Sequence, residues 1–373
     1  MNDIRIDRSS TPKGLSLGEL AAELERQKHA KRDFMADTRE LTVEPDDDSP
    51  TKLTLKVGTV DRFPVRQHAV RQIGSRLNIP AKYVDRLAET HPDLLAYNVN
   101  TLFEREPENR MVRVLDNDCR AFLSDKFRPL DNFDFAQATL PKLIDLNAKV
   151  LSCEVTERRM YIKAIVPDVV REIKAPGVFF GDGGHNTIHV LRPGVCLSNS
   201  EVGAGSMAVQ PGIHEKHCSN LAIFNKNAMR KYHVGARQAT DQEGMWEMFT
   251  DATKRASDKA FWLQVQDLVS AGLEGELFQQ LVIQCERAIT GAQIDKPIAA
   301  VRELEDLSEN EQDGVLTHLI QGGELSQWGM QAAITRFAQQ ADVGYERQVE
   351  LEQVGGNIIE LPTSQWAAIA EAA

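Results

Sequence analysis

Residues 110–127, RMVRVLDNDCRAFLSDKF, indicate the fold class. Short runs rich in apolar residues lie on both sides of Asp116-Asn117-Asp118, a triplet of residue types that favour tight turns. The stretch therefore predicts two antiparallel strands joined by a short turn. Residues 149–167, KVLSCEVTERRMYIKAIVP, repeat the pattern, with a turn expected at residues 156–159. Two such hairpins favour an antiparallel sheet over alternating βαβ units.

Between and after these hairpins the sequence predicts a helix and further strands. Asp131 or Asn132 is the expected N-cap of the helix, which carries Phe135, Leu140, Leu143 and Ile144 on its apolar face. Short strands are expected at TIHVL, GVCLSN, SMAVQ and HCSNLAIF. We therefore predict an α+β fold with an antiparallel, hairpin-rich central sheet and a covering helix.

The segment before this sheet is predicted to be mainly helical. A helix is expected over residues 16–37, followed by the acidic loop EPDDDSPT and the strand KLTLKVG. Residues 64–95 predict two helices separated by the breaker NIP, a helix-turn-helix-like hairpin. The hairpin is either plain scaffold or a DNA-binding motif. In the second case its contacts would come from Arg66, Arg71, Arg76, Lys82 and Arg86.

The segment after the sheet is predicted to form about five helices. Thr240 with Glu243, and Ser308 with Glu311, match the S/T-x-x-E pattern of a helix capping box. The predicted segments are 1–60 (helix, acidic loop and strand), 61–108 (helical hairpin), 109–239 (basic α+β core), 240–345 (acidic helices) and 346–373 (C-terminal tail).

Composition narrows the class of protein. The chain has 373 residues, 42% hydrophobic and 26% charged, which is ordinary for globular proteins. No stretch matches a membrane span or a secretory signal, so we expect a cytoplasmic protein without a membrane partner. The five cysteines are widely spaced and form no C-x-x-C pair, which favours reduced thiols.

Charge is unevenly distributed along the chain. Residues 109–239 contain 18 Lys and Arg against 13 Asp and Glu, whereas residues 240–373 contain 8 against 23. A basic segment with interspersed aromatic residues is typical of single-strand binding, because cations follow phosphates and aromatic rings stack on bases. The aromatic residues are Phe122, Phe127, Tyr161, Phe224 and Tyr232. The predicted nucleic-acid-binding residues are Arg113, Arg120, Lys126, Phe127, Arg128, Arg158, Arg159, Lys163, Lys216, Lys226, Arg230 and Lys231.

The glycine-rich stretch CLSNSEVGAGSMA, residues 196–208, has the spacing G-x-G-x-x-A of a dinucleotide-binding loop. Such a loop must open a helix, and Pro211 follows too soon for one. We therefore predict two strands joined by a turn, with Gly203 and Gly205 free to take positive φ, and no cofactor. The polar residues Asn199, Ser200 and Glu201 are expected at its tip.

Histidines and cysteines near residue 214 leave a second chemistry open. His214, His217 and Cys218 are close in sequence, with His185, His189 and Cys196 upstream. Zinc needs four converging ligands, and a Cys-His nucleophilic site needs the pair in hydrogen-bond reach. We expect surface histidines and a buried cysteine here, with no metal.

Several stretches together resemble the phage/plasmid-like family of domain of unknown function 932. They are RAFLSDKFRPLDN, LSNSEVGAGSMAV with HCSNLAI, LNIPAKYVDRLAETHPDLLAYNVN and WGMQAAITRFAQQA, within residues 62–361. The resemblance implies a mobile-element context. It also suggests an outline similar to the single-strand annealing proteins of phage recombination modules, which are α+β, oligomeric and independent of metal or nucleotide.

Three functions follow from these observations. The leading prediction is a homo-oligomeric protein that binds single-stranded DNA and promotes annealing without covalent catalysis, with an acidic helical segment that contacts a host replication or repair protein. The second is a non-enzymatic protein that inhibits or recruits a host nuclease, repair or defence factor. The third is a hydrolase or nuclease that uses the Cys and His residues of region 185–218.

Overall fold

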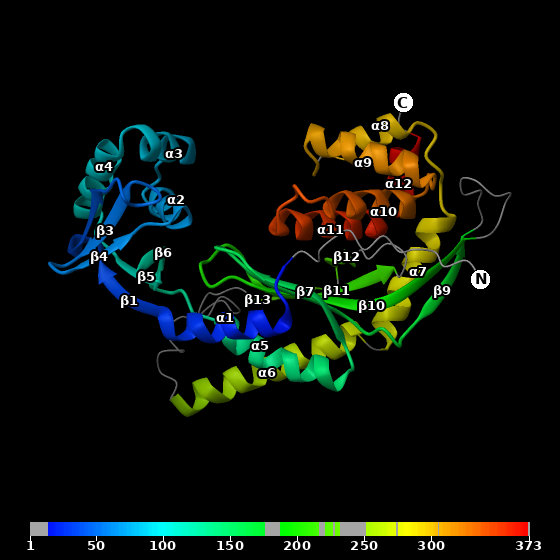
Figure 1. The fold of residues 1–373 in the computed structure, drawn as a ribbon, viewed down its shortest axis with the longest axis horizontal. Helices are drawn as coiled ribbons and strands as arrows, with labels where there is room; N and C mark the ends of the chain where they lie inside the picture. Colours follow the sequence, from blue (N-terminus) through cyan, green and yellow to red (C-terminus); the bar gives the residue numbers. More distant parts are fainter. Residues whose placement is uncertain are drawn as a thin grey trace.

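The computed structural model describes residues 14–175, 187–215, 221–226, 228–231, 251–273, 275–304 and 306–371. Two lobes are visible in it (Figure 1). The N-terminal lobe comprises residues 31–124, and the sheet lobe comprises the helix that precedes them and the described residues that follow. Helices and antiparallel sheets are combined in one chain, which confirms the predicted α+β class.

The N-terminal lobe packs helices against two small sheets. Within the described residues the sheet orders are β1-β5-β6 and β2-β3-β4, and all pairs are antiparallel. The strands are β1 (Lys31–Asp37), β2 (Leu41–Pro45), β3 (Leu53–Val57), β4 (Asp61–Pro64), β5 (Asn109–Leu115) and β6 (Asp118–Ser124). The helices are η1 (Thr38–Glu40), α2 (Gln67–Arg76), α3 (Ala81–Thr90) and α4 (Pro92–Arg105). One apolar core, with Phe63, Val70, Phe103 and Phe122 at its centre, joins these elements.

The β5–β6 hairpin forms where the sequence predicts it. Asp116 and Asn117 both have positive φ, 53° and 66°, as a two-residue turn of type I′ requires. Asn and Asp tolerate this conformation better than other non-glycine residues. Local turn chemistry therefore sets the register of this hairpin.

The sheet lobe is built on a long antiparallel sheet. Among the described residues its strand order is β12-β11-β10-β8-β7, with β13 paired to β11 and β9 paired to β10. The strands are β7 (Lys149–Val155), β8 (Met160–Ile165), β9 (Arg171–Ala175), β10 (Thr187–Asn199), β11 (Met207–Glu215), β12 (Leu221–Ile223) and β13 (Met229–Lys231). The strands predicted at TIHVL and GVCLSN form one continuous strand, β10.

Helices cover both faces of this sheet (Figure 1). The sequence predicted at least one helix, on one face. On one face α1, α5 and α6 pack through Leu20, Phe135 and Val265 onto Ile162 and Val195. On the other face lie α7, α10 and α11. The helices are α1 (Leu17–Ala30), α5 (Asn132–Asp145), α6 (Asp251–Leu273), α7 (Glu276–Thr290), α8 (Pro297–Arg302), α9 (Glu309–Gly322), α10 (Gln327–Ala338), α11 (Tyr345–Glu360) and α12 (Thr363–Ala370).

Helix boundaries follow local signals in two predicted places. Asp131 is the N-cap of α5, and the capping box of Ser308 and Glu311 begins α9. The box predicted at Thr240 lies outside the described residues. Within the described ranges, no helix combines the length and apolar character that a membrane span requires.

Three expectations about organisation are wrong. The predicted first helix ends at Ala30, because residues 31–37 pair with β5 as strand β1. The β5–β6 hairpin belongs to the N-terminal lobe and not to the central sheet, so the boundary predicted at residue 109 is not one in the fold. Both differences arise because strand pairing partners are distant in sequence.

The third wrong expectation is the C-terminal tail at residues 346–373. Its described part forms α11 and α12, and α11 packs on β12. Gly356 permits this packing, since a Cβ there would lie 1.9 Å from the carbonyl oxygen of Ile223. Glycine has a low helix propensity, so the adjacent Gly355 and Gly356 make this segment look less helical in the sequence. In the structure Gly356 is the residue that lets α11 approach β12 closely.

Candidate functional site

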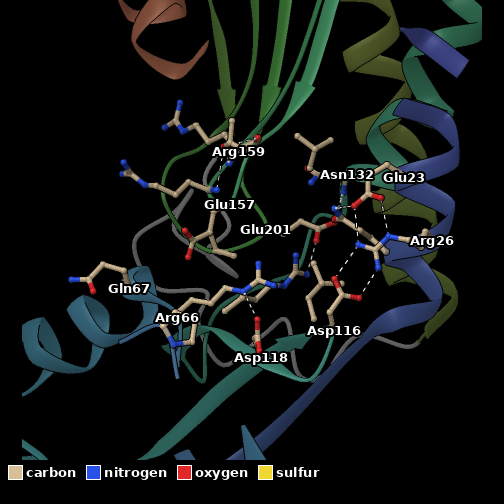
Figure 2. Close-up of a pocket in the computed structure, with 18 of the residues that line it drawn as sticks. Glu23, Arg26, Arg66, Gln67, Asp116, Asp118, Asn132, Glu157, Arg159 and Glu201 are labelled. Atoms are coloured by element: carbon tan, nitrogen blue, oxygen red, sulfur yellow. Dashed lines mark hydrogen bonds and ion pairs between the residues drawn. The ribbon is translucent and has the colours of Figure 1, made fainter. Parts of the chain in front are cut away.

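A cavity of about 460 Å³ lies where the two lobes meet (Figure 2). We call it the interlobe cavity. Its walls come from α1, the start of α2, the β5–β6 turn, the β7–β8 turn and the residues that follow β10. The charged residues that line it are Arg26, Arg66, Arg120, Arg158, Arg159, Glu23, Asp116, Asp118, Glu157 and Glu201. Its volume is in the range of small-molecule sites.

A second cavity of about 260 Å³, the α11 cavity, lies against the first residues of α11. It is lined by Tyr161, Gln210 and Arg230 from the sheet and by Glu346 and Gln353 from α11, among others. Arg158 and Arg159, at the β7–β8 turn, line both cavities. The two cavities therefore form adjoining parts of one surface region.

The turn after β10 joins the lobes. Asn199, Ser200 and Glu201 are 0%, 0% and 5% exposed, so the polar tip predicted for this turn is buried. Glu201 accepts hydrogen bonds from Arg120 Nη2 at 2.6 Å and from the backbone N of Asn132 at 2.7 Å. These contacts connect β6 of one lobe to the N-terminus of α5 in the other.

Backbone atoms of the same turn complete the joint. The carbonyl oxygen of Glu201 accepts a bond from Arg113 Nη1 at 2.7 Å, and that of Val202 accepts one from Gln72 Nε2 at 2.8 Å. His68 Nε2 also lies 2.9 Å from the Val202 oxygen. Residues 199–202 thus hold the N-terminal lobe through β5, β6 and α2.

The two glycines of the turn have different roles. Gly203 has φ 73°, the left-handed conformation that glycine takes at little cost. Gly205 has no positive φ, contrary to the prediction, but a Cβ there would lie 1.5 Å from Arg159 Nη2. Gly205 therefore leaves room for the Arg159 guanidinium, which donates to the Ala204 carbonyl oxygen at 2.9 Å.

Arg113 is the most deeply buried arginine of this joint. Its side chain is 0% exposed and pairs with Asp33 at 2.7 Å and Asp131 at 3.0 Å. Asp131 also pairs with Lys31. Burial alone would raise the pKa of Asp131, but Lys31 and Arg113 outweigh it and lower that pKa. Asp131 is therefore ionised at neutral pH beside the Arg113 guanidinium.

Three predicted nucleic-acid-binding residues are unavailable to a ligand on the surface. Arg113 is enclosed as described, Arg120 is 4% exposed and pairs with Glu201, and Lys163 is 2% exposed and pairs with Glu352 at 2.6 Å. A phosphate-binding role on an open surface is therefore wrong for these three. The sequence does not show whether a charged side chain in a strand points to solvent or into the protein. That depends on the residues that pack against the strand in the tertiary structure.

The predicted stacking residues also lie inside. Phe122, Tyr161 and Phe224 are 3%, 3% and 0% exposed and belong to apolar clusters. Phe127 is half-buried, and Tyr232 lies outside the described residues. Base stacking on Phe122, Tyr161 and Phe224 is therefore excluded.

The other predicted residues are spread over the sheet lobe and the end of β6. Lys126, Arg158, Lys226 and Arg230 are exposed, and Arg128 and Arg159 are half-buried. Lys226 lies beside α11, where its Nζ donates to the Glu360 carbonyl oxygen at 2.6 Å. Lys216 lies outside the described residues, and for Lys231 only the backbone of β13 is described.

Of these, Arg158, Arg159 and Arg230 converge on the α11 cavity. In the described part of the chain, no carboxylate lies within ion-pair distance of Arg159 or Arg230. Arg230 donates to the neutral Asn225 side chain at 2.7 Å. Arg158 is 53% exposed and lies 3.6 Å from Glu346. These three guanidinium groups retain capacity to bind an anion.

Three of the four arginines of the helical hairpin form ion pairs within their own lobe, whereas Arg86 is exposed. Arg66 pairs with Asp118, Arg71 with Asp85, and Arg76 with Glu108, at 3.1, 3.0 and 2.5 Å. This pairing supports the scaffold interpretation of the hairpin. The sequence predicted a ligand contact for Arg66 only if the hairpin is a DNA-binding motif. In the structure Arg66 lines the interlobe cavity.

The Cys and His residues do not form a nucleophilic pair in the described ranges. His214 is buried in β11, and burial together with the charge of Arg192 lowers its pKa to about 4. Burial raises the pKa of Cys196 to about 12, the opposite of an activated thiol. His217 and Cys218 lie outside the described residues. Among the described residues, no group of three or more His, Cys, Asp or Glu is placed to hold a metal ion.

Sequence reasoning missed Arg26, Gln67 and Glu157 at the interlobe cavity. They come from α1, α2 and the β7–β8 turn, which lie far apart in the chain, and no local pattern marks them. No protein-family model, curated protein or solved structure matches the chain. The resemblance to the family of domain of unknown function 932 therefore stays a prediction.

Proposed function

We propose that the protein binds single-stranded DNA through its phosphates, along the surface that runs from the α11 cavity past the β7–β8 turn to the interlobe cavity. The observation that carries this proposal is the convergence of Arg158, Arg159 and Arg230 on the α11 cavity with charge that carboxylates do not fully neutralise. Arginine is well suited to phosphate because its planar donors match the oxygens.

A single strand fits this surface better than a duplex. The arginines line two adjoining hollows, which a flexible strand can follow and a rigid double helix cannot. With Phe122, Tyr161 and Phe224 inside the core, the strand is held by its backbone and most of its bases stay free. Free bases are what annealing to a complementary strand requires. Oligomer formation and a host partner for the acidic helices remain further predictions of this proposal.

Binding of a fluorescent mixed-sequence 30-mer, measured by anisotropy at several salt concentrations, tests the proposal. The variant combines Arg158→Gln, Arg159→Gln and Arg230→Gln. For single strands each phosphate contact contributes about 0.7 to the slope of log K against log salt. The triple variant should therefore lose affinity and flatten the slope by about 2.

Arg302→Gln is the matched control. Arg302 is an exposed arginine, with side-chain exposure of 45%, that pairs with Asp313 and lines neither cavity. Its removal should leave both affinity and slope unchanged. Absence of single-strand binding by the natural chain, or an unchanged slope in the triple variant, would refute the proposal. Stoichiometric capture of one host protein without DNA would favour the inhibitor or recruiter function instead.

A further inference from the structure

The interlobe cavity differs from the α11 cavity in the chemistry of its lining. Beside its arginines it presents carboxylates: Glu157 is exposed, and the Asp118 side chain is 28% exposed. In Figure 2 two residues of the N-terminal lobe, Arg66 and Asp118, lie across the cavity from Glu157 and Glu201 of the sheet lobe. Arginines donate hydrogen bonds and carboxylates accept them, so this site suits a ligand that has hydrogen-bond acceptors and donors next to each other. A phosphate offers acceptors alone and does not match the carboxylates.

Arg120 gives an independent indication of a ligand. It lines this cavity and is 4% exposed, and its Nη2 is occupied by Glu201 at 2.6 Å. Its Nε is buried without a hydrogen-bond partner among the described residues. A buried donor without an acceptor costs free energy, and such groups are rare in folded proteins. An acceptor atom of a bound molecule would satisfy it.

Glu157 supplies the complementary group. It lies in the turn between β7 and β8, next to Arg158 and Arg159, which line both cavities. In the described part of the chain its carboxylate takes part in no ion pair. A strand bound by these arginines would therefore pass directly beside a carboxylate that can accept hydrogen bonds.

We propose that the interlobe cavity receives one base of the bound strand and favours bases with an exocyclic amino group, cytosine above thymine. This inference rests on the proposed function. The cytosine amino group would donate to Glu157, and its neighbouring ring acceptors would face Arg120. Carboxylates accept from the cytosine amino group in base recognition. Thymine has a carbonyl oxygen at that position, which the carboxylate repels. The cavity volume of about 460 Å³ admits one nucleotide.

The test compares binding of oligo-dC and oligo-dT of equal length by anisotropy, with the natural chain and with Glu157→Gln. We expect the natural chain to bind oligo-dC about tenfold more tightly, the scale of one good base contact. Removing a negative charge strengthens binding of both oligonucleotides through their phosphates. The ratio of the two affinities is therefore the informative quantity, and in Glu157→Gln it should fall to about one.

Glu25→Gln is the matched control. Glu25 is an exposed glutamate of α1, with side-chain exposure of 53%, that lines neither cavity. It should keep the tenfold ratio. Equal, salt-dependent binding of both oligonucleotides by the natural chain would overturn this inference and leave the proposed function standing. So would a ratio that Glu157→Gln does not change. Absence of binding to either oligonucleotide would overturn both.

Discussion

Glu201→Gln should destabilise the protein strongly through the joint between the lobes. The side chains of Arg120 and Glu201 are each 5% exposed, and they meet at 2.6 Å. Among the described residues, Glu201 is the only hydrogen-bond partner of the Arg120 side chain. The amide of glutamine keeps the shape of the carboxylate but removes its charge, and its single oxygen cannot serve both Arg120 and the Asn132 backbone N.

The expected cost is about 3–5 kcal/mol, because removal of one partner leaves a buried charge without compensation. This is a large part of a typical folding free energy of about 5–15 kcal/mol. Urea unfolding followed by circular dichroism measures the loss. Asp313→Asn is the control: it breaks the Arg302–Asp313 pair at 2.6 Å, with side chains 45% and 66% exposed, and should cost at most about 1 kcal/mol.

A double-mutant cycle shows whether charge is the cause. Arg120→Met combined with Glu201→Gln removes both charges, so the double variant should be more stable than Glu201→Gln alone. A cost below about 1 kcal/mol for Glu201→Gln, or strictly additive effects in the double variant, would refute the assigned role of this buried pair.

Two further variants test packing and pH dependence. Gly356→Ala should lower the unfolding free energy by about 1–3 kcal/mol or more in urea melts, because its Cβ would lie 1.9 Å from the Ile223 carbonyl oxygen. Gly18→Ala, in open space on α1, should be neutral or stabilising, and equal effects of the two would contradict this packing. A hydrogen bond from Arg347 lowers the pKa of Glu311 from 4.5 to about 2. Its contribution to stability is therefore complete above about pH 4.5 and is lost as pH falls toward 2, so Glu311→Gln should destabilise at pH 7 and not at pH 2. An equal loss at both pH values in urea melts would rule out this linkage.

Local features of the fold could be predicted from sequence because their causes are local. Asp116 and Asn117 supply the left-handed conformations of the β5–β6 turn. Asp131 and Ser308 occupy the N-cap positions of α5 and α9 as expected, although only Ser308 forms a capping box and the Asp131 side chain makes no cap hydrogen bond. Short runs rich in apolar residues then indicate strands on either side of the turns. These signals suffice for the α+β class. They do not show which strands pair, and so strand β1 and the lobe to which β5 and β6 belong were missed.

The candidate site depended on tertiary structure. The sequence identifies Arg113, Arg120 and Arg159 equally as basic residues among strands. In the structure Arg113 is enclosed by two carboxylates, Arg120 is buried beside Glu201 at the interlobe cavity, and Arg159 is half-buried at both cavities. Their partners are distant: 80 positions separate Arg113 from Asp33, and 81 separate Arg120 from Glu201. By itself the sequence determined the hairpins, most of the helices before residue 345 and an excess of basic charge in the middle of the chain. Only the tertiary structure decided which charges face a ligand, because burial and pairing of a charge depend on groups brought together from distant parts of the chain.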